Sequence, residues 1–117
     1  MLNSVFDPTI DRLARGLAWA ARRHEVLAQN VANAETPGYR AQDVRFDALL
    51  ASASDASAPV EPRPVAVADG AARPDGNDVH VERQMARLAE NQLMHHALAQ
   101  ILAGQFTALK QAISGRV

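Results

Sequence analysis

The sequence contains no cysteine, few aromatic residues and no long apolar run. One Trp, one Tyr and three Phe make up 4% of the 117 residues. Without cysteine the chain can form neither a disulfide framework nor a thiol-based catalytic site. No window of about 18 apolar residues is present, so the sequence predicts no membrane-spanning helix. The N-terminus also lacks the basic and apolar segments of a cleavable secretory signal.

Charge and composition limit the functions and the number of domains that the chain can have. The formal net charge is −1, so no global field favours nucleic acid or an acidic surface. Hydrophobic residues make up 48% of the chain, but many of them are alanine. A chain this short and this poor in large side chains buries a thin core. The sequence therefore predicts at most one domain, whose stability depends on a partner or on self-assembly.

Apolar residues recur at alternating steps of three and four over residues 10–34. This spacing is typical of a coiled-coil helix. The helix can begin at Asp7, with Pro8 in its first position, or at Asn3 or Ser4 as the cap. The interface residues expected on this helix are Leu13, Leu17, Leu27 and Val31.

The N-terminal helix must end before Thr36. Pro37 lacks a backbone N–H, and its ring disfavours a helical conformation at Thr36. Pro37 and Gly38 are the favoured central pair of a type II turn, which needs a positive φ at the glycine. Asn30 and Asn33 lie in the last turns, where their amides can bond nearby backbone groups or a neighbouring chain.

The middle of the chain contains two segments that differ from the long helices, residues 36–50 and residues 51–77. Val44 and Phe46 alternate with polar residues, which predicts a short strand or extended arm within residues 36–50. Phe46 and Leu50 would meet if the end of this arm is helical. Residues 51–77 are rich in Ala, Ser, Pro, Asp and Gly and are interpreted as a flexible linker or a small β element.

A second long helix is expected over residues 78–117, with Asn77 or Asp78 as its N-cap. Its apolar residues again recur in steps of four and three, from Val81 to Ile113. The simplest fold is mainly α, with the two terminal helices paired as an antiparallel coiled coil and residues 1–35 supplying the first. The interface residues expected on the second helix are Met85, Leu88, Leu102, Phe106, Leu109 and Ile113.

No pattern of residues indicates catalysis. The sequence has no phosphate-binding glycine loop, no nucleophile elbow and no metalloprotease helix. His24 and His95 both fall on the apolar seams and can face each other, but no ligand cluster has zinc-like spacing. We interpret them as polar seam residues, and we expect no catalytic residue, cofactor, metal or small-molecule substrate.

The stretch at the end of the first helix resembles the signature of the flagellar rod and hook family of axial proteins. The residues that match it are Asn30, Ala32, Asn33, Thr36, Pro37, Gly38 and Tyr39. The C-terminal stretches 82–93 and 106–113 are similar to the last helix of proximal-rod members of that family. The resemblance covers residues 10–50 and 75–115.

This resemblance implies a structural subunit of the proximal rod that assembles helically in the periplasm and transmits torque. It implies as partners other rod subunits, further copies of the chain, the adaptor at the rod base, the membrane-embedded ring and the type III export gate. Export would occur without a cleaved signal. Phe46 and Leu50 are similar to the short export-gate motif of such subunits, although they can equally be packing residues.

Two other classes of protein fit parts of the sequence. A helical-hairpin adaptor or chaperone of a type III secretion system would never polymerise. A regulatory binder would use the arginines of the first helix, although a solvated or intersubunit face accounts for them more simply. Concentration-dependent assembly distinguishes the rod subunit, and salt-sensitive nucleic-acid binding would favour the regulator.

Overall fold

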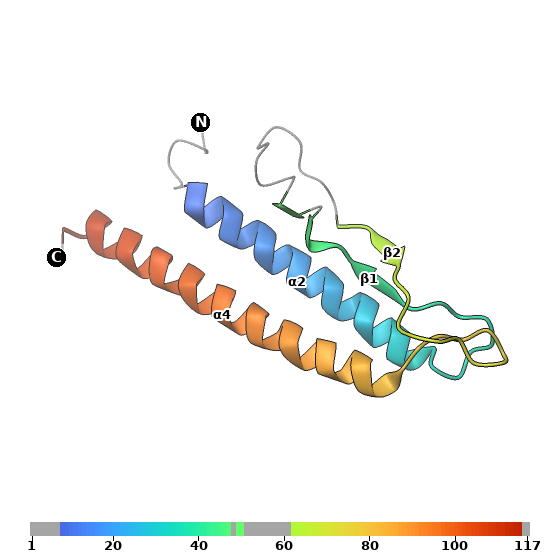
Figure 1. Ribbon diagram of the computed structural model, residues 1–117. Helices are drawn as coiled ribbons and strands as arrows, with labels where there is room; N and C mark the ends of the chain where they lie inside the picture. The colour runs from blue at the N-terminus through green and yellow to red at the C-terminus, as the bar shows by residue number, and fades with distance from the viewer. Residues whose placement is uncertain (1–7, 48, 51–61, 116–117) are drawn as a thin grey trace.

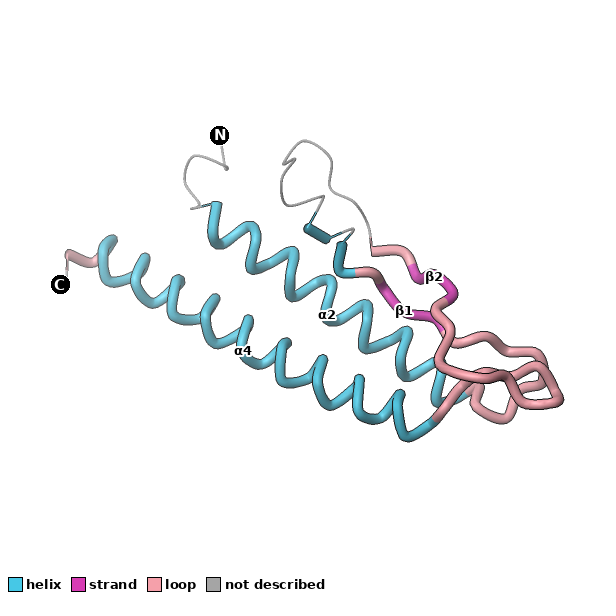
Figure 2. The backbone as a smooth tube through the Cα atoms, in the orientation of Figure 1, coloured by secondary structure: helices cyan, strands magenta, loops and turns pink. Residues whose placement is uncertain are grey.

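The computed structural model describes residues 8–47, 49–50 and 62–115. Its elements in chain order are helix α2 (Pro8–Ala32), strand β1 (Gln42–Val44), strand β2 (Pro64–Ala66) and helix α4 (Val81–Ile113). The two long helices run antiparallel, side by side, and the Pro-Gly turn and the loop that leads into α4 lie together at one end of the pair (Figures 1 and 2). The predicted antiparallel helical pair is confirmed.

The first helix begins at Pro8, where its missing N–H costs no helical hydrogen bond. The alternative caps Asn3, Ser4 and Asp7 lie outside the described residues. The helix ends at Ala32, before Thr36 as predicted.

The Pro-Gly turn has the predicted geometry. Gly38 has a φ of +77°, and the Tyr39 N–H donates to the Thr36 carbonyl at 3.2 Å. A positive φ at the third residue of a hydrogen-bonded turn is the feature of type II. The chain therefore reverses here and enters the arm alongside α2.

The arm forms a two-stranded antiparallel sheet with a segment from the middle of the chain. β1 pairs with β2 in the register Gln42↔Ala66, Asp43↔Val65 and Val44↔Pro64. Pro64 is tolerated because the second strand is an edge strand. Residues 46, 47, 49 and 50 are helical, as expected after the strand. Of the two alternatives for residues 51–77, the structure places a small β element at Pro64–Ala66; residues 51–61 lie outside the described part.

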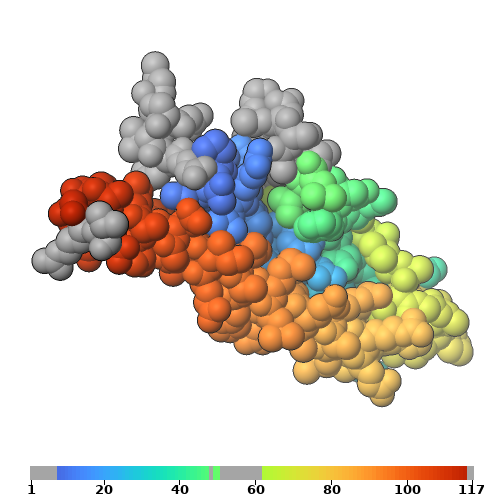
Figure 3. Space-filling model, turned by 60° about the vertical axis from the view of Figure 1, so that its left-hand side comes forward, coloured from blue at the N-terminus to red at the C-terminus, as the bar shows by residue number. Residues whose placement is uncertain are grey.

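Helix α2 lies between α4 on one side and the sheet on the other (Figures 1 and 3). Ala20 and Leu27 are fully buried, whereas Trp19 and Val26 pack with Val44 of the arm. The helices approach closely at Gly16, where a Cβ would lie 3.2 Å from Leu98 Cδ1. The heptad pattern predicts only one buried face of α2. The second face exists because the arm folds back along the helix.

The predicted start of the second helix is wrong by a few residues. α4 begins at Val81, and its N-cap is His80, which makes no side-chain capping bond. Asn77 and Asp78 do not cap the helix because their side chains bind backbone groups of the turn and the arm. The His80 N–H is instead bound by the carboxylate of Asp69 at 2.7 Å.

The predicted seam of α4 is displaced from the face that packs on α2. The fully buried residues of this helix are the polar Gln84 and Asn91, while Leu88, Leu102 and Leu109 are half-buried. On α2, Leu27 is buried and Leu13, Leu17 and Val31 are half-buried. Met85 and Phe106 are 54% and 47% exposed and Ile113 is 79% exposed, so these three are not part of the seam within one chain.

Candidate functional site

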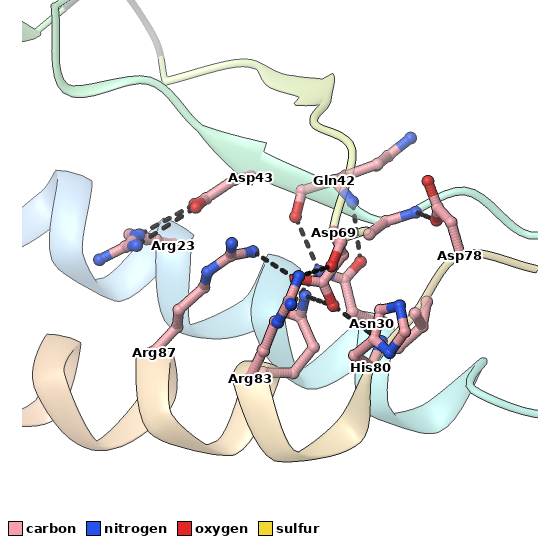
Figure 4. A network of polar contacts seen from close by, with 12 residues as sticks. Arg23, Asn30, Gln42, Asp43, Asp69, Asp78, His80, Arg83 and Arg87 are labelled. Atoms are coloured by element: carbon pink, nitrogen blue, oxygen red, sulfur yellow. Dashed lines mark hydrogen bonds and ion pairs between the residues drawn. The ribbon is translucent and has the colours of Figure 1, made fainter. Parts of the chain in front are cut away.

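Asn30, the first residue of the family-like signature, is the centre of a buried polar network (Figure 4). Its Nδ2 donates to the Gln42 carbonyl at 2.7 Å and to Gln84 Oε1 at 2.9 Å. Its Oδ1 accepts from the Tyr39 hydroxyl and from the Gln42 N–H, each at 3.0 Å. The full hydrogen-bonding capacity of the amide is used. One side chain therefore joins α2 to the arm and to α4.

The network continues from α4 to the buried carboxylate of Asp69 (Figure 4). Asp69 Oδ2 accepts from Gln84 Nε2 at 3.0 Å, and Oδ1 lies 3.2 Å from Arg87 Nη1. Arg83 also donates to the Asp69 backbone carbonyl. A buried carboxylate is tolerated only when it is paired and hydrogen-bonded, and these contacts meet that requirement. Asp69 thus fixes the loop before α4 against the first turns of that helix.

The Pro-Gly turn is held by the loop that leads into α4. Asn77 Nδ2 donates to the Asn33 carbonyl at 2.9 Å and to the Thr36 carbonyl at 2.8 Å. The Gly38 N–H donates to the Asp75 carbonyl at 2.9 Å. The last carbonyls of a helix lack partners within the helix. Here the side chain of Asn77, more than forty residues away, donates a hydrogen bond to the carbonyl of Asn33 at the end of the helix.

Hydrogen bonds to carboxylates fix the direction of the arm on both sides. The Asp78 carboxylate accepts from the Ala41 N–H at 2.6 Å. Arg23 of α2 binds Asp43 through two hydrogen bonds of 2.9 and 3.2 Å, and both side chains are largely buried. The Arg23 guanidinium also lies 5.5 Å from the centre of the Trp19 ring. Bidentate Arg–carboxylate pairs are geometrically specific, so the arm has one orientation along α2.

Burial raises the pKa of the Tyr39 phenol above its ordinary value. Folding therefore favours the protonated hydroxyl, which is the form that donates to Asn30. Because the folded-state pKa is raised, this contribution is complete below the unfolded pKa and is lost as pH rises through the folded one. The signature hydrogen bond therefore persists at neutral pH.

The structure brings together most of the signature residues but not all. Asn30, Asn33, Thr36, Gly38 and Tyr39 take part in the contacts above or in the short bonds of the turn. Ala32 and Pro37 are exposed. The role of the signature in assembly stays a prediction.

The residues proposed for export lie at the end of the arm. Phe46 is 48% exposed and Leu50 is 56% exposed. The Phe46 ring meets Trp19 edge-on, with the ring centres 5.3 Å apart. Phe46 is thus both accessible and in contact with the core, and its role in export stays a prediction.

The sequence reasoning missed the polar partners of the signature. Asp69, Asn77 and Asp78 fall in or beside the stretch interpreted as linker, where nothing local marks a buried side chain. Gln84 and Asn91 are seven residues apart, and Leu98 follows at the same spacing. That second heptad row is the signal that could have located the face of α4 toward α2.

The arginines of α2 mostly face carboxylates. The pairs are Arg15 with Asp11 at 3.1 Å, Arg22 with Glu25 at 2.8 Å, and Arg23 with Asp43 at 2.9 Å. This pairing does not favour the nucleic-acid binder. In the part of the chain that the structure describes, neither long helix is apolar enough to cross a membrane.

Comparison with known proteins gives the class to which this hairpin belongs. Residues 10–40, which hold most of α2 and the Pro-Gly turn, match the family described as "Flagella basal body rod protein". The match includes every signature residue. A structural role in the flagellar rod follows, and this family is not a family of enzymes.

Full-length relatives make the assignment more specific. The chain is 31% identical to the flagellar basal body rod protein FlgB of Bacillus subtilis, over 96% of this chain and 98% of the relative. It is 33% identical to FlgB of Cereibacter sphaeroides, over 87% of this chain and 91% of that one, and 28% identical to FlgB of Salmonella typhimurium, over 81% and 85%. The chain belongs to the FlgB family of flagellar basal body rod proteins.

Proposed function

We propose that this chain is a structural subunit of the proximal rod, which assembles helically with itself and with other rod proteins and transmits torque from the motor ring to the hook. Two observations together support this proposal. Buried polar contacts hold rigid the end of the hairpin that carries the Pro-Gly turn, which we call the closed end, and one face of α4 is exposed. Asn30 and Asp69 fix the hairpin, the arm and the loop as one body. Met85, Phe106 and Ile113 remain exposed on α4, where another helix can cover them.

The position of the protein in purified basal bodies tests this proposal. A tagged full-length chain should copurify with the rod and be detected at its base, next to the adaptor and the membrane-embedded ring. The concentrated pure protein should form filaments or rings. The alternative, a hairpin adaptor or chaperone, predicts a soluble species of fixed size at every concentration and no protein in the finished rod.

Export is the second part of the proposal. The chain would reach the periplasm through the flagellar type III export gate without cleavage of a signal. Phe46 and Leu50 are the residues proposed to contact the gate. Their exposure supports this role, because a recognition element must be accessible before assembly. The contact of Phe46 with Trp19 supports the competing role in packing.

Substituting Phe46 and Leu50 by alanine separates these roles. If both residues contact the gate, Phe46→Ala and Leu50→Ala each retain the protein in the cytoplasm. If they only pack, both mutants reach the periplasm, and Phe46→Ala lowers the free energy of unfolding by about 1 kcal/mol through the lost aromatic pair. Fractionation of cells with expression matched to wild type measures the distribution. Wild-type periplasmic levels of both mutants would contradict the export role.

Gly38→Val should impair assembly more than export. Gly38 has a φ of +77°, and a β-branched side chain in this region costs roughly 1–2 kcal/mol. A Cβ at this position meets no atom within 4 Å, so the effect comes from the backbone and not from a clash. We expect secreted protein near the wild-type level and few completed rods. Normal swimming of the Gly38→Val strain would reject this role of the turn.

A further inference from the structure

The chain contains two Asp-Gly pairs, Asp69-Gly70 and Asp75-Gly76, and both lie in the segment between β2 and α4. An Asp-Gly pair is chemically labile, because glycine has no Cβ to hinder its backbone nitrogen when that nitrogen approaches the preceding carboxyl group. Attack closes a succinimide ring, and opening of the ring by water gives isoaspartate. Since the two pairs are identical in sequence, their surroundings alone decide which one reacts in the folded protein.

The carboxylate of Asp69 is held away from this reaction (Figure 4). Asp69 is 1% exposed, and its Oδ2 accepts from the His80 N–H at 2.7 Å and from Gln84 Nε2 at 3.0 Å. Its Oδ1 lies 3.2 Å from Arg87 Nη1. All of these groups belong to α4 or to its N-cap. The Gly70 nitrogen could reach the Asp69 carboxyl carbon only after the contacts to α4 had opened.

Asp75 has the opposite environment. Its side chain is 39% exposed, and its Oδ1 accepts from the Asn77 N–H at 3.0 Å. An aspartate that binds the N–H two residues further on folds back over the intervening peptide, which here is that of Gly76. The Gly76 N–H donates to the Arg73 carbonyl at 2.8 Å, but this bond lies along the N–H direction, whereas attack uses the face of the peptide.

We propose that Asp75 is a modification site, at which the folded protein converts spontaneously to isoaspartate with water as the only co-reactant. The Gly76 nitrogen loses its proton and bonds to Asp75 Cγ, while the protonated carboxyl group releases its hydroxyl, so one water molecule leaves. Water then adds to the backbone carbonyl carbon of Asp75 and breaks its bond to the nitrogen. The chain now continues through Cγ, the former backbone carbonyl is the free carboxylate, and nothing is oxidised or reduced.

Isomerisation at this position acts on the Pro-Gly turn. The Asp75 carbonyl accepts the Gly38 N–H at 2.9 Å, and Asn77 binds the carbonyls of Asn33 and Thr36. Isoaspartate adds one carbon to the backbone between these contacts and replaces the accepting carbonyl by a carboxylate. Both sets of bonds cannot be kept, so the modification releases the turn from the loop that holds it. This inference concerns the chemistry of the single chain and does not depend on the proposed assembly.

Storage of the full-length protein in neutral buffer tests this inference. A protease that cuts before aspartate but not before isoaspartate then reads each position separately. We expect cutting to be lost at Asp75, and the reaction at Asp69 to be at least about tenfold slower, because its buried hydrogen bonds must open first. In urea the two pairs should react at similar rates. Asp75→Glu is the matched control, since it keeps the charge but would need a larger and slower-forming ring.

Hydrogen exchange measures the effect on the turn. Exchange of the Gly38 amide should be faster in the isomerised protein than in fresh protein, and it should not change when Asp75→Glu is stored in the same way. Equal reaction at Asp69 and Asp75 in the folded protein would overturn the inference. So would folded protein without isoaspartate at Asp75 after a time in which both pairs have reacted in urea. Unchanged exchange at Gly38 after isomerisation would overturn the effect inferred for the turn.

Discussion

Asn30→Leu is expected to lower the free energy of unfolding by roughly 3 kcal/mol or more. The substitution removes four hydrogen bonds from a fully buried site. It leaves the Gln42 N–H and carbonyl and Gln84 Oε1 without partners where little water can replace them, and each such group costs about 1–3 kcal/mol. Urea unfolding of the pure full-length chain, followed by circular dichroism, measures the change.

Asn33 provides the matched control for this prediction. Asn33→Ala removes bonds to the Gln29 carbonyl and the Thr36 hydroxyl that lie at the exposed end of α2. Its cost should not exceed about 1 kcal/mol, because water can solvate the groups it releases. Equal losses for Asn30→Leu and Asn33→Ala would mean that the buried network does not determine the stability of the closed end.

Replacing glycine by alanine is expected to lower the stability of the chain at Gly70 and to raise it at Gly104. Gly70 has a φ of +136°, and a Cβ there would lie 2.7 Å from His80 Nε2 and 3.0 Å from Arg83 Nη1. Backbone strain of this kind costs about 1–3 kcal/mol, and the clash with a partly buried ring adds to it. Gly70→Ala should therefore destabilise the chain by roughly 3 kcal/mol and displace the loop that carries Asp69.

Gly104→Ala should stabilise the chain instead. Gly104 is within α4, and a Cβ there meets no atom within 4 Å. Alanine in place of glycine inside a helix gains about 0.5–1 kcal/mol. Thermal or urea unfolding of both variants checks the signs, and hydrogen exchange at the first turn of α4 should increase only in Gly70→Ala. A Gly70→Ala protein as stable as wild type would contradict the prediction, because it would show that the loop can rearrange around the added methyl group at no cost in stability.

The sequence alone determined the two helices, the end of the first helix with the turn that follows it, and the family. Local rules suffice for these features. The heptad spacing requires a helix on each side, Pro37 ends the first one, and Gly38 allows the turn. The sequence left two alternatives open for residues 51–77, a flexible linker or a small β element, because the prolines there exclude a helix but do not require a strand.

Only the tertiary structure decided which residues are buried together. A polar residue such as Asp69 or Asn77 is found in loops far more often than in a core, so its sequence predicts exposure. Its burial here depends on partners that the fold brings from distant positions, Gln84 to Asp69 and Asn33 to Asn77. A hydrogen bond of this kind has no local pattern, because only the antiparallel return of α4 places the two groups within reach.

The apolar residues of α4 also show that the sequence does not determine which residues are buried together. Its heptad pattern identified a continuous row that includes Met85 and Phe106, but the face against α2 is the neighbouring row of Gln84, Asn91 and Leu98. Periodicity determines that a helix has an apolar stripe, and it does not determine which partner covers it. Within one chain, buried amides fix that choice, since Asn91 binds the Ala20 carbonyl and Gln84 binds Asn30. Part of the row that the sequence marks most clearly, Met85, Phe106 and Ile113, therefore remains exposed on the single chain.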